Sequence, residues 1–394
     1  MQIDLGGEAK GPLTGVRVLD VSSIVSGPMC AQILGDFGAD VVKVEPPIGD
    51  TVRYLGREGP PAYSGLFAQF NRNKRSIAID LKQEAGRDAF LKLAEDADIV
   101  VENYRAGVAD RLGIGFETAR KNNPGLIWVA ISGFGPDGPY KDQPAYDMVI
   151  QGMSGFAKML GDDDNPKLIS NLVADKTSGL TAAYSVIAAL YAREKNGGRG
   201  QRIDVPMLDA FASFVHSDGF SAHTFGEVPV ESGMDGVYRA WKTADGHVSF
   251  LVIEDHQFES MCKIVEREDL IGDEQYTGLA NRIANAEGLF VILEAELLKF
   301  STAVLVERAH AYGMPLGAVN DMKGFLEDAQ VVHNETVFEL EDPEGVSMKL
   351  FRSAPRFGET PTSVRRSPPR LGADTDVILR ELGLDDDQIA KAKG

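Results

Sequence analysis

Residues 15–45 read GVRVLDVSSIVSGPMCAQILGDFGADVVKVE, and this stretch decides the fold class. Apolar and β-branched residues dominate 15–23 and again 40–45, which is typical of buried strands. The segment between them, 27–39, has the composition of a helix, and Pro28 suits the first turn of one. A strand, a helix and a second strand in direct succession predict a βαβ unit with parallel strands.

The same alternation continues through the first half of the chain. Further strand-like runs occupy 76–81, 97–103 and 126–132, with helical segments between them. This pattern predicts an α/β fold in which helices cover a parallel sheet. The turn after the first strand is VSGP rather than GxGxxG, which argues against a bound dinucleotide.

A long apolar helix is expected within 171–193, NLVADKTSGLTAAYSVIAALYAR. Asp175 comes directly before its periodic part, and Gly179 interrupts it early. Asp is a favoured N-cap and its carboxylate suits the positive end of a helix, so capping is the commoner role for Asp175 on this stretch alone. The apolar positions at helical spacing are Leu180, Ala183, Ile187 and Leu190.

The character of the sequence changes near residue 220. Polar and apolar residues alternate through 226–253 with turn signals between them, as in an antiparallel sheet. Helical stretches follow from 256 to 312, and 313–321 returns to a strand-like pattern. We therefore predict a large domain over 1–220 and a small α+β domain over 221–328.

The remaining residues, 329–394, contain a Pro-rich stretch and a closing helix over 375–393. This tail is too short for a core of its own. It is expected to return to the large domain and pack on it.

Composition excludes several classes of partner. The 394 residues carry a formal net charge of −19, which argues against nucleic acid or an anionic membrane surface. No apolar run approaches about 18 residues, and the first residues lack the features of a secretory signal. The two cysteines, Cys30 and Cys262, lie far apart and fit a cytoplasmic protein. No cluster of His, Asp and Glu has metal-ligand spacing, so no metal site is expected.

Seven blocks of the sequence, in their order, resemble the family III CoA-transferases. This group includes carnitine-CoA and formyl-CoA transferases and the α-methylacyl-CoA racemases. The resemblance covers essentially the whole chain. The blocks are GPLTGVRVLDVSSIVSGPMCAQILGDFGADVVKVEPPIGD, FNRNKRSIAIDLK, ADIVVENYRAGVADRLGIG, ISGFGPDGPY, LVADKTSGLTAAYSVIAALYAREKNGGRGQRIDVPMLDA, TADGHVSF and APRFGETP.

The resemblance implies an architecture that composition does not reveal. It implies a large domain with a Rossmann-like sheet, completed by the C-terminal tail, and a smaller domain inserted between these parts. Two such chains are expected to interlock as a homodimer. Active sites would then lie between the large domain of one subunit and the small domain of the other.

Asp175 lies in the VADKTSG block and matches the essential Asp of the family, which is the nucleophile in its transferases. The resemblance therefore implies an enzyme that moves CoA from an acyl-CoA donor to a free carboxylic acid through an aspartyl-CoA thioester. A protein carboxylate divides a difficult exchange into easier steps. The CoA thioester is then a substrate, and no permanently bound cofactor is expected.

Positions in the family-like motifs suggest the groups that hold CoA. Each has a structural alternative: Arg111 could pair with Asp110 or Glu102, Lys82 could be a solvated surface residue, and 23–25 could be strand-end packing. The basic cluster 71–76 could likewise attract phosphates or serve the structure. The predicted CoA-binding residues are Ser23, Ile24, Val25, Lys82, Asn103, Arg111 and Tyr146.

Two other functions compete with transfer. A racemase needs two acid–base groups, and in the family's racemases the partner of the Asp is a His that precedes another Asp. Here Tyr146 occupies that position, before Asp147, and Tyr is a poor base at neutral pH. Glu254 resembles an acidic position of the racemases, and His256 lies close to it, but Tyr146 favours the transferase. The third possibility is an acyl-CoA-binding relative without turnover, and the intact motif around Asp175 argues against it.

Overall fold

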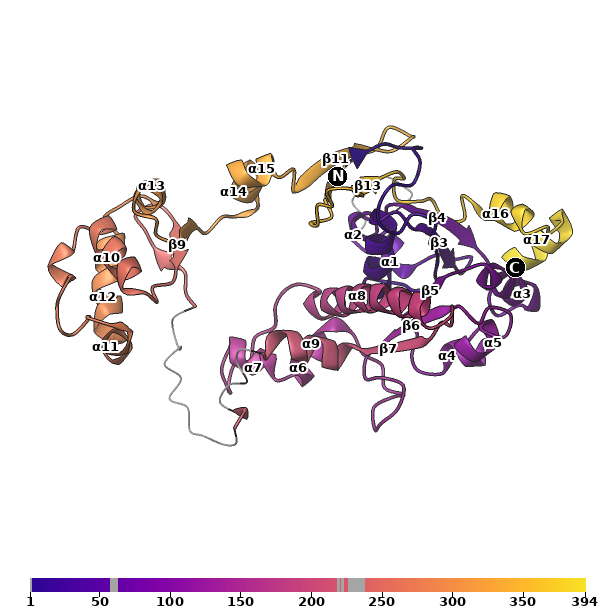
Figure 1. Cartoon of the computed structure of the whole chain (residues 1–394), viewed down its shortest axis with the longest axis horizontal. Coiled ribbons are helices and arrows are strands. Elements are labelled where there is room, and N and C mark those ends of the chain that lie inside the picture. Colours follow the sequence, from indigo (N-terminus) through magenta and orange to yellow (C-terminus); the bar gives the residue numbers. More distant parts are fainter. Residues whose placement is uncertain (1, 57–62, 218–219, 221–222, 226–237) are drawn as a thin grey trace. The chain divides into compact units, whose positions relative to one another are not determined.

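The structure is a computed structural model that describes residues 2–56, 63–217, 220, 223–225 and 238–394. The chain forms two compact units (Figure 1). Unit 1 consists of residues 1–221 and 335–394, and unit 2 consists of 222–334. The small domain was predicted from the sequence at 221–328. Residue 221, its predicted first residue, is outside the described residues.

Unit 1 is built on a six-stranded parallel sheet with the order β4-β3-β2-β5-β6-β7. Numbered along the chain from β2, this is the 3-2-1-4-5-6 order of Rossmann folds. The predicted α/β class is confirmed, since all five strands expected from the sequence pair in this sheet. The strands are β2 (Arg17–Asp20), β3 (Asp40–Glu45), β4 (Lys74–Ala78), β5 (Ile99–Glu102), β6 (Ile127–Ser132) and β7 (Arg202–Pro206).

Helices cover both faces of this sheet because alternate side chains of each strand enter different cores. Val18 and Ile99 pack with one helical layer, whereas Leu19 and Val100 pack with the other. The first layer contains α1 (Ser26–Asp36), α8 (Val173–Lys195) and α9 (Met207–Val215). The second contains α3 (Glu84–Glu95), α5 (Phe116–Ala119), α16 (Thr375–Glu381) and α17 (Asp386–Lys393).

The C-terminal segment of unit 1 returns to the sheet, and α17 lies beside α3 (Figure 1). Strand β1 (Gln2–Ile3) pairs in parallel with β13 (Ser363–Val364), which joins the first residues to the segment that follows unit 2. The other elements of unit 1 are η1 (Thr51–Tyr54), α2 (Gly65–Phe70), α4 (Val108–Arg111), α6 (Asp147–Met153), α7 (Phe156–Leu160), and the hairpin of β11 (Val337–Glu341) and β12 (Ser347–Phe351).

Unit 2 is a small α+β arrangement with its own apolar core. Its antiparallel sheet has the order β10-β9-β8, formed by β8 (Trp241–Lys242), β9 (His247–Phe250) and β10 (Leu316–Ala318). The first part of the predicted sheet region, 226–237, lies outside the described residues. The helices are α10 (Asp255–Ile264), η3 (Glu268–Leu270), α11 (Leu279–Ala284), α12 (Ala286–Leu297), α13 (Thr302–Tyr312), α14 (Met322–Glu327) and α15 (Ala329–His333).

Two local predictions were wrong. Helix α8 begins at Val173, so Asp175 is the third residue of the helix and not the N-cap that this stretch alone favoured. The closing helix is two helices, because the chain turns at Gly383 with a φ of +80° and Asp385 caps α17. A left-handed φ ends a helix, and glycine adopts it without strain.

No helix among the described residues combines the length and the apolar character that crossing a membrane requires.

Candidate active site

The centre of the sheet edge is formed by the loops that follow β2 and β5. These neighbouring strands carry connections to opposite sides, and ligands of open α/β sheets bind at such a point. The Asn103 side chain joins the two loops, since its oxygen accepts from the Ser23 N–H at 2.9 Å and its amide donates to the Ser23 carbonyl at 2.7 Å. The turn that leads from β2 into α1 is therefore held on β5.

Helices α1 and α8 approach each other closely beside this turn. A Cβ added at Gly179 would lie 2.5 Å from the Ser26 carbonyl oxygen, so only glycine fits here without a shift of the backbone. Gly179 follows Asp175 by one turn of α8 and therefore lies on the same side of the helix. The first residue of α1 is thus brought against the part of α8 that carries Asp175.

The Ser26 hydroxyl lies near the Asp175 carboxylate and favours its ionised form. The Ser26 oxygen in turn accepts from the Asn103 amide at 3.2 Å. Hydrogen bonds from Asn103 therefore hold the start of α1 on β5, with the Ser26 hydroxyl near the Asp175 carboxylate.

Asp147 of α6 is the residue that caps α8. Its Oδ2 accepts from the N–H groups of Ala174, at 2.7 Å, and Asp175, at 3.0 Å. Gln151 donates to its other oxygen at 2.5 Å, and the side chain is buried. The cap expected of Asp175 thus comes from another helix, which leaves the Asp175 carboxylate available for chemistry.

The environment of Asp175 raises the pKa of its carboxyl from the ordinary Asp range to about 7. Burial is the main cause, and the negative charge of Asp147 adds to it, while the hydrogen bond from Ser26 acts in the opposite direction. Near neutral pH the group is therefore divided between acid and carboxylate. A poorly solvated carboxylate is a better nucleophile than one surrounded by water.

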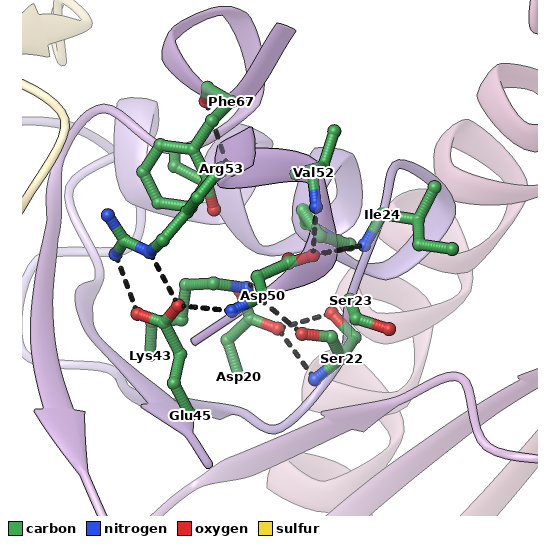
Figure 2. Close-up of polar contacts among 12 residues, drawn as sticks. Asp20, Ser22, Ser23, Ile24, Lys43, Glu45, Asp50, Val52, Arg53 and Phe67 are labelled. Atoms are coloured by element: carbon green, nitrogen blue, oxygen red, sulfur yellow. Dashed lines mark hydrogen bonds and ion pairs between the residues drawn. The ribbon is translucent and has the colours of Figure 1, made fainter. Parts of the chain in front are cut away.

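A network of buried charges lies against the turn between β2 and α1 (Figure 2). Lys43 donates to the Ser22 carbonyl at 3.0 Å and to Asp50 at 3.1 Å. Glu45 and Arg53 form a bidentate pair with both distances at 2.7 Å, and the Arg53 guanidinium lies 3.8 Å from the centre of the Phe67 ring. The turn is therefore supported by fully paired charges.

The basic cluster 71–76 belongs to this internal support. Lys74 donates to Asp20 at 2.8 Å, and burial lowers the pKa of its ammonium group to about 8. Arg72 forms a buried pair with Asp36 at 2.5 Å. Both cations are buried and paired, so the alternative in which they attract phosphates is wrong.

The structure brings together four of the predicted CoA-binding residues, Ser23, Ile24, Val25 and Asn103, at the central edge of the sheet. Ile24 has a left-handed backbone with a φ of +70°, and Val25 is completely buried. Any contact of Val25 with CoA would therefore involve a change in its surroundings or its backbone.

Two predicted CoA-binding cations, Lys82 and Arg111, are exposed in the segments that follow β4 and β5. Among the described residues Arg111 forms no ion pair, including with Asp110 or Glu102, and it lies against Gly107. Tyr146 is 64 % exposed and directly precedes the cap residue of α8. These contacts with CoA remain predictions.

Sequence reasoning missed Ser26 and Asp50, and treated Asp147 only as a neighbour of Tyr146. Ser26 and Asp147 act across long sequence separations, which one sequence does not reveal. Gly179 was a usable signal, because a glycine inside an apolar helix often marks a close approach of another backbone.

The acidic residue that resembles a racemase position, Glu254, lies in unit 2. It precedes α10, and the ring of His256 is 3.0 Å from its carboxylate, with both side chains largely exposed. No group of three or more His, Cys, Asp or Glu side chains in the described part of the chain is arranged to hold a metal ion.

Comparison with known proteins identifies the family of the chain. Residues 13–375 match the family described as CoA-transferase family III. The chain belongs to this family. The predicted resemblance is therefore confirmed, and the site lies on the fold of a CoA-transferase.

Individual relatives match over nearly the whole chain. The succinyl-CoA:mesaconate CoA-transferase of Haloarcula marismortui is 32 % identical, with 95 % of this chain and 97 % of the relative covered. The formyl-CoA:oxalate CoA-transferase of Streptomyces avermitilis is also 32 % identical, with 97 % and 98 % covered. The crystal structure of a CAIB/BAIF family protein from Brucella suis is 30 % identical, has a TM-score of 0.82, and is matched over 95 % of this chain and all of its own.

Proposed function

We propose that this protein transfers CoA between carboxylic acids and that Asp175 is its nucleophile. Membership of CoA-transferase family III supports the reaction class. The observation that carries the assignment of Asp175 is that it does not cap its own helix, because Asp147 accepts from the first N–H groups of α8. The Asp175 carboxylate is therefore available, poorly solvated and close to the Ser26 hydroxyl.

The reaction begins when the Asp175 carboxylate attacks the thioester carbonyl of the donor. The C–S bond breaks, CoA leaves as a thiolate, and an acyl-aspartyl anhydride forms. The thiolate then attacks the carbonyl of Asp175, which releases the donor acid as a carboxylate and leaves an aspartyl-CoA thioester. The acceptor carboxylate repeats these two steps in reverse, so that acyl-CoA forms and Asp175 is regenerated.

Two features of the site suit this sequence of steps. The start of α1, which has no acidic residue in its first turn, places a positive helix end near the negative charge that develops at the attacked carbonyl. The half-buried position of Asp175 restricts access of water, which would hydrolyse both the anhydride and the thioester.

The substrates are acyl-CoA esters and free carboxylic acids, without a permanently bound cofactor. The named relatives include enzymes for succinyl-CoA with mesaconate and for formyl-CoA with oxalate. We therefore propose short carboxylic acids, including dicarboxylic acids, as the first donors and acceptors to assay. Lys82 and Arg111 would attract the CoA phosphates, which an otherwise acidic protein repels.

The active assembly is proposed to be an interlocked homodimer in the cytoplasm. Support for a dimer comes from α8, which exposes an apolar stripe that includes Tyr184 and Tyr191, 60 % and 65 % exposed. Such a stripe is unusual on a surface that faces only water. Both cysteines are free and buried, which suits a reducing compartment.

Trapping of the aspartyl intermediate tests this function. The wild-type protein is incubated with pooled short acyl-CoA esters, and hydroxylamine is then added, which should convert Asp175 to a hydroxamate that peptide mass spectrometry detects. Asp175→Asn should give neither hydroxamate nor transfer while keeping its melting temperature. A hydroxamate on another peptide, or transfer by the Asn variant at a near-normal rate, would disprove the assignment.

Solvent exchange separates transfer from the racemase alternative. A racemase that uses Asp175 as a base would replace the α-proton of a 2-methylacyl-CoA ester by deuterium in D₂O. We expect the α-proton signal to persist in proton NMR during many turnovers of transfer. Rapid exchange that disappears in Asp175→Asn would favour the racemase.

A further inference from the structure

Ile24 has a backbone conformation that a β-branched residue rarely adopts. Its φ is +70°, at the turn that follows β2 and precedes α1. A non-glycine residue in this region costs on the order of 1–3 kcal/mol, and it persists only where the surrounding structure holds it. The turn therefore contains a strained residue beside the proposed nucleophile.

The group that holds Ile24 is the buried carboxylate of Asp50 (Figure 2). Both of its oxygens lie 3.2 Å from the Ile24 nitrogen, and Oδ1 also accepts from the Val52 N–H at 3.1 Å. Lys43 adds a second connection, because its ammonium group joins Oδ2 of Asp50 to the Ser22 carbonyl. The turn is thus anchored on both sides of its strained residue.

The strained residue Ile24 is close in sequence to Ser26, which lies beside the proposed nucleophile. Val25 precedes α1 as its cap residue, and Ser26 is only two residues from Ile24. The Ser26 backbone packs against α8 at Gly179, one turn after Asp175, and the Ser26 hydroxyl acts on the Asp175 carboxyl. A change of φ at Ile24 would turn the peptide groups around it and displace Ser26. Asp50 and Lys43 are at most 3 % exposed, so they act without touching CoA.

We propose that Asp50, together with Lys43, is a positioning residue of the transferase that holds Ile24 in its left-handed conformation and so keeps the Ser26 hydroxyl on Asp175. This inference rests on the proposed function of Asp175. A carboxylate is required because three donors converge on it: the N–H groups of Ile24 and Val52 and the ammonium of Lys43. An amide would place its own N–H group against one of them.

Asp50→Asn tests the proposal, with two measurements. In transfer assays kcat should fall at least tenfold, while KM for the CoA ester changes less than about threefold. The second measurement is the pH midpoint of Asp175 labelling by a water-soluble carbodiimide, followed by peptide mass spectrometry. This midpoint should rise in Asp50→Asn relative to wild type.

The direction of the midpoint separates positioning from a simple change of charge. The groups that act on the Asp175 carboxyl are Asp147 of α6 and the Ser26 hydroxyl of α1. Displacement of the Ser26 hydroxyl raises the pKa of Asp175, whereas removal of a negative charge at Asp50 alone would lower it. An unchanged or lower midpoint in a folded Asp50→Asn protein overturns the proposal.

Asp36→Asn is the matched control. It removes another buried carboxylate, the partner of Arg72, from the opposite end of α1. Its melting temperature should fall as that of Asp50→Asn does, but the labelling midpoint and kcat should stay at their wild-type values. Equal changes in both variants would show that the effect of Asp50 is only structural.

Two additional variants keep the test decisive. Ile24→Gly combined with Asp50→Asn should recover part of the lost kcat, because glycine adopts a positive φ without strain. If Asp50→Asn does not fold, Lys43→Gln replaces it in the test, and the pH midpoint of Asp175 labelling should rise in the same way. The labelling requires no acyl-CoA. Absence of a hydroxamate in wild type would therefore disprove the function of Asp175, while the midpoint still decides on Asp50.

Discussion

At the scale of single residues, the sequence suggested two roles for Asp175, helix cap and nucleophile, and the structure gives the capping role to Asp147. Asp147 satisfies the first N–H groups of α8, and its charge acts on Asp175 at the same time. The same residue therefore both builds the helix end and adjusts the ionisation of the nucleophile. Asp175 must be ionised to attack, so activity should increase as the pH rises through about 7.

Asp147→Asn should shift this pH dependence. The asparagine keeps an oxygen for the α8 N–H groups but removes the negative charge, which lowers the pKa of Asp175. The acidic limb of the pH profile of kcat/KM should move to lower pH by roughly one unit. A shift of this size corresponds to the loss of about 1.4 kcal/mol of repulsion between the two carboxylates. A pH–rate profile from pH 5 to 9 measures the shift. An acidic limb of kcat/KM that stays at the wild-type pH would show that the charge of Asp147 does not influence the pKa of Asp175.

Arg111→Ala addresses the predicted contact with the CoA phosphates. A lost charged contact of about 1.4 kcal/mol corresponds to a tenfold rise in KM, with kcat little changed. The dependence of KM on salt concentration should also become weaker. Arg120→Ala is the control, because Arg120 is an exposed cation that directly follows α5 and pairs with Glu117 at 3.2 Å. Equal KM values for the two variants would disprove the contact.

At the scale of elements, the spacing of α1 and α8 determines whether Ser26 reaches Asp175. The two helices can approach closely because Gly179 of α8 has no side chain where it faces the Ser26 carbonyl of α1. The remaining face of α8 is rich in alanine, and the buried residues include Ala182, Ala183 and Ala189. Small side chains let the two helices pack at short distance.

Gly179→Ala should separate these helices. The added methyl group would lie 2.5 Å from a backbone oxygen, and such overpacking costs about 1–3 kcal/mol. We expect a lower melting temperature and a fall in kcat of at least tenfold. Gly288→Ala in α12 is the control, since its nearest atom is 3.8 Å away and alanine favours a helix. It should keep its activity and melt at the same or a higher temperature.

The elements also show what one sequence can predict. The strands were predictable because β-branched runs such as 40–45 reproduce the observed β3. The start of α8 was not, because its cap comes from Asp147, 26 residues before Val173. The expected apolar face was partly wrong as well: Leu180 and Ile187 are exposed, while alanines fill the core. Alanine gives a weak signal of burial, since it is common on every helix face.

The candidate site divides in the same way. Asp175 was identifiable from its motif, whereas its partners were not. The contact with Ser26 joins residues far apart in the chain, and the support from Asp50 depends on a φ value that side-chain patterns do not encode. Long-range hydrogen bonds of this kind require the folded structure.

At the scale of the whole molecule, the exposed stripe of α8 bears on assembly. The stripe consists of Leu180, Tyr184, Ile187 and Tyr191, which recur on one side of the helix. If the proposed dimer forms through this stripe, Tyr184→Glu combined with Ile187→Glu should yield monomers in light scattering coupled to gel filtration. Val377→Glu on α16 is a matched control, an exposed apolar residue elsewhere, and should remain dimeric. A dimer that tolerates both charges on α8 would place the interface elsewhere.

The divided sequence of unit 1 has a consequence for the synthesis of the protein on the ribosome. Residues 222–334 leave the exit tunnel as one continuous segment, so unit 2 can fold while the chain is still growing. Unit 1 has to wait for a segment that follows unit 2 in the chain: Ile389 and Ala392 complete the core beside α3, and Asn73 binds the backbone of Arg365. Until α17 has left the tunnel, the core of unit 1 is incomplete and part of its apolar surface is uncovered. Enzymatic activity should therefore arise only after this segment has emerged.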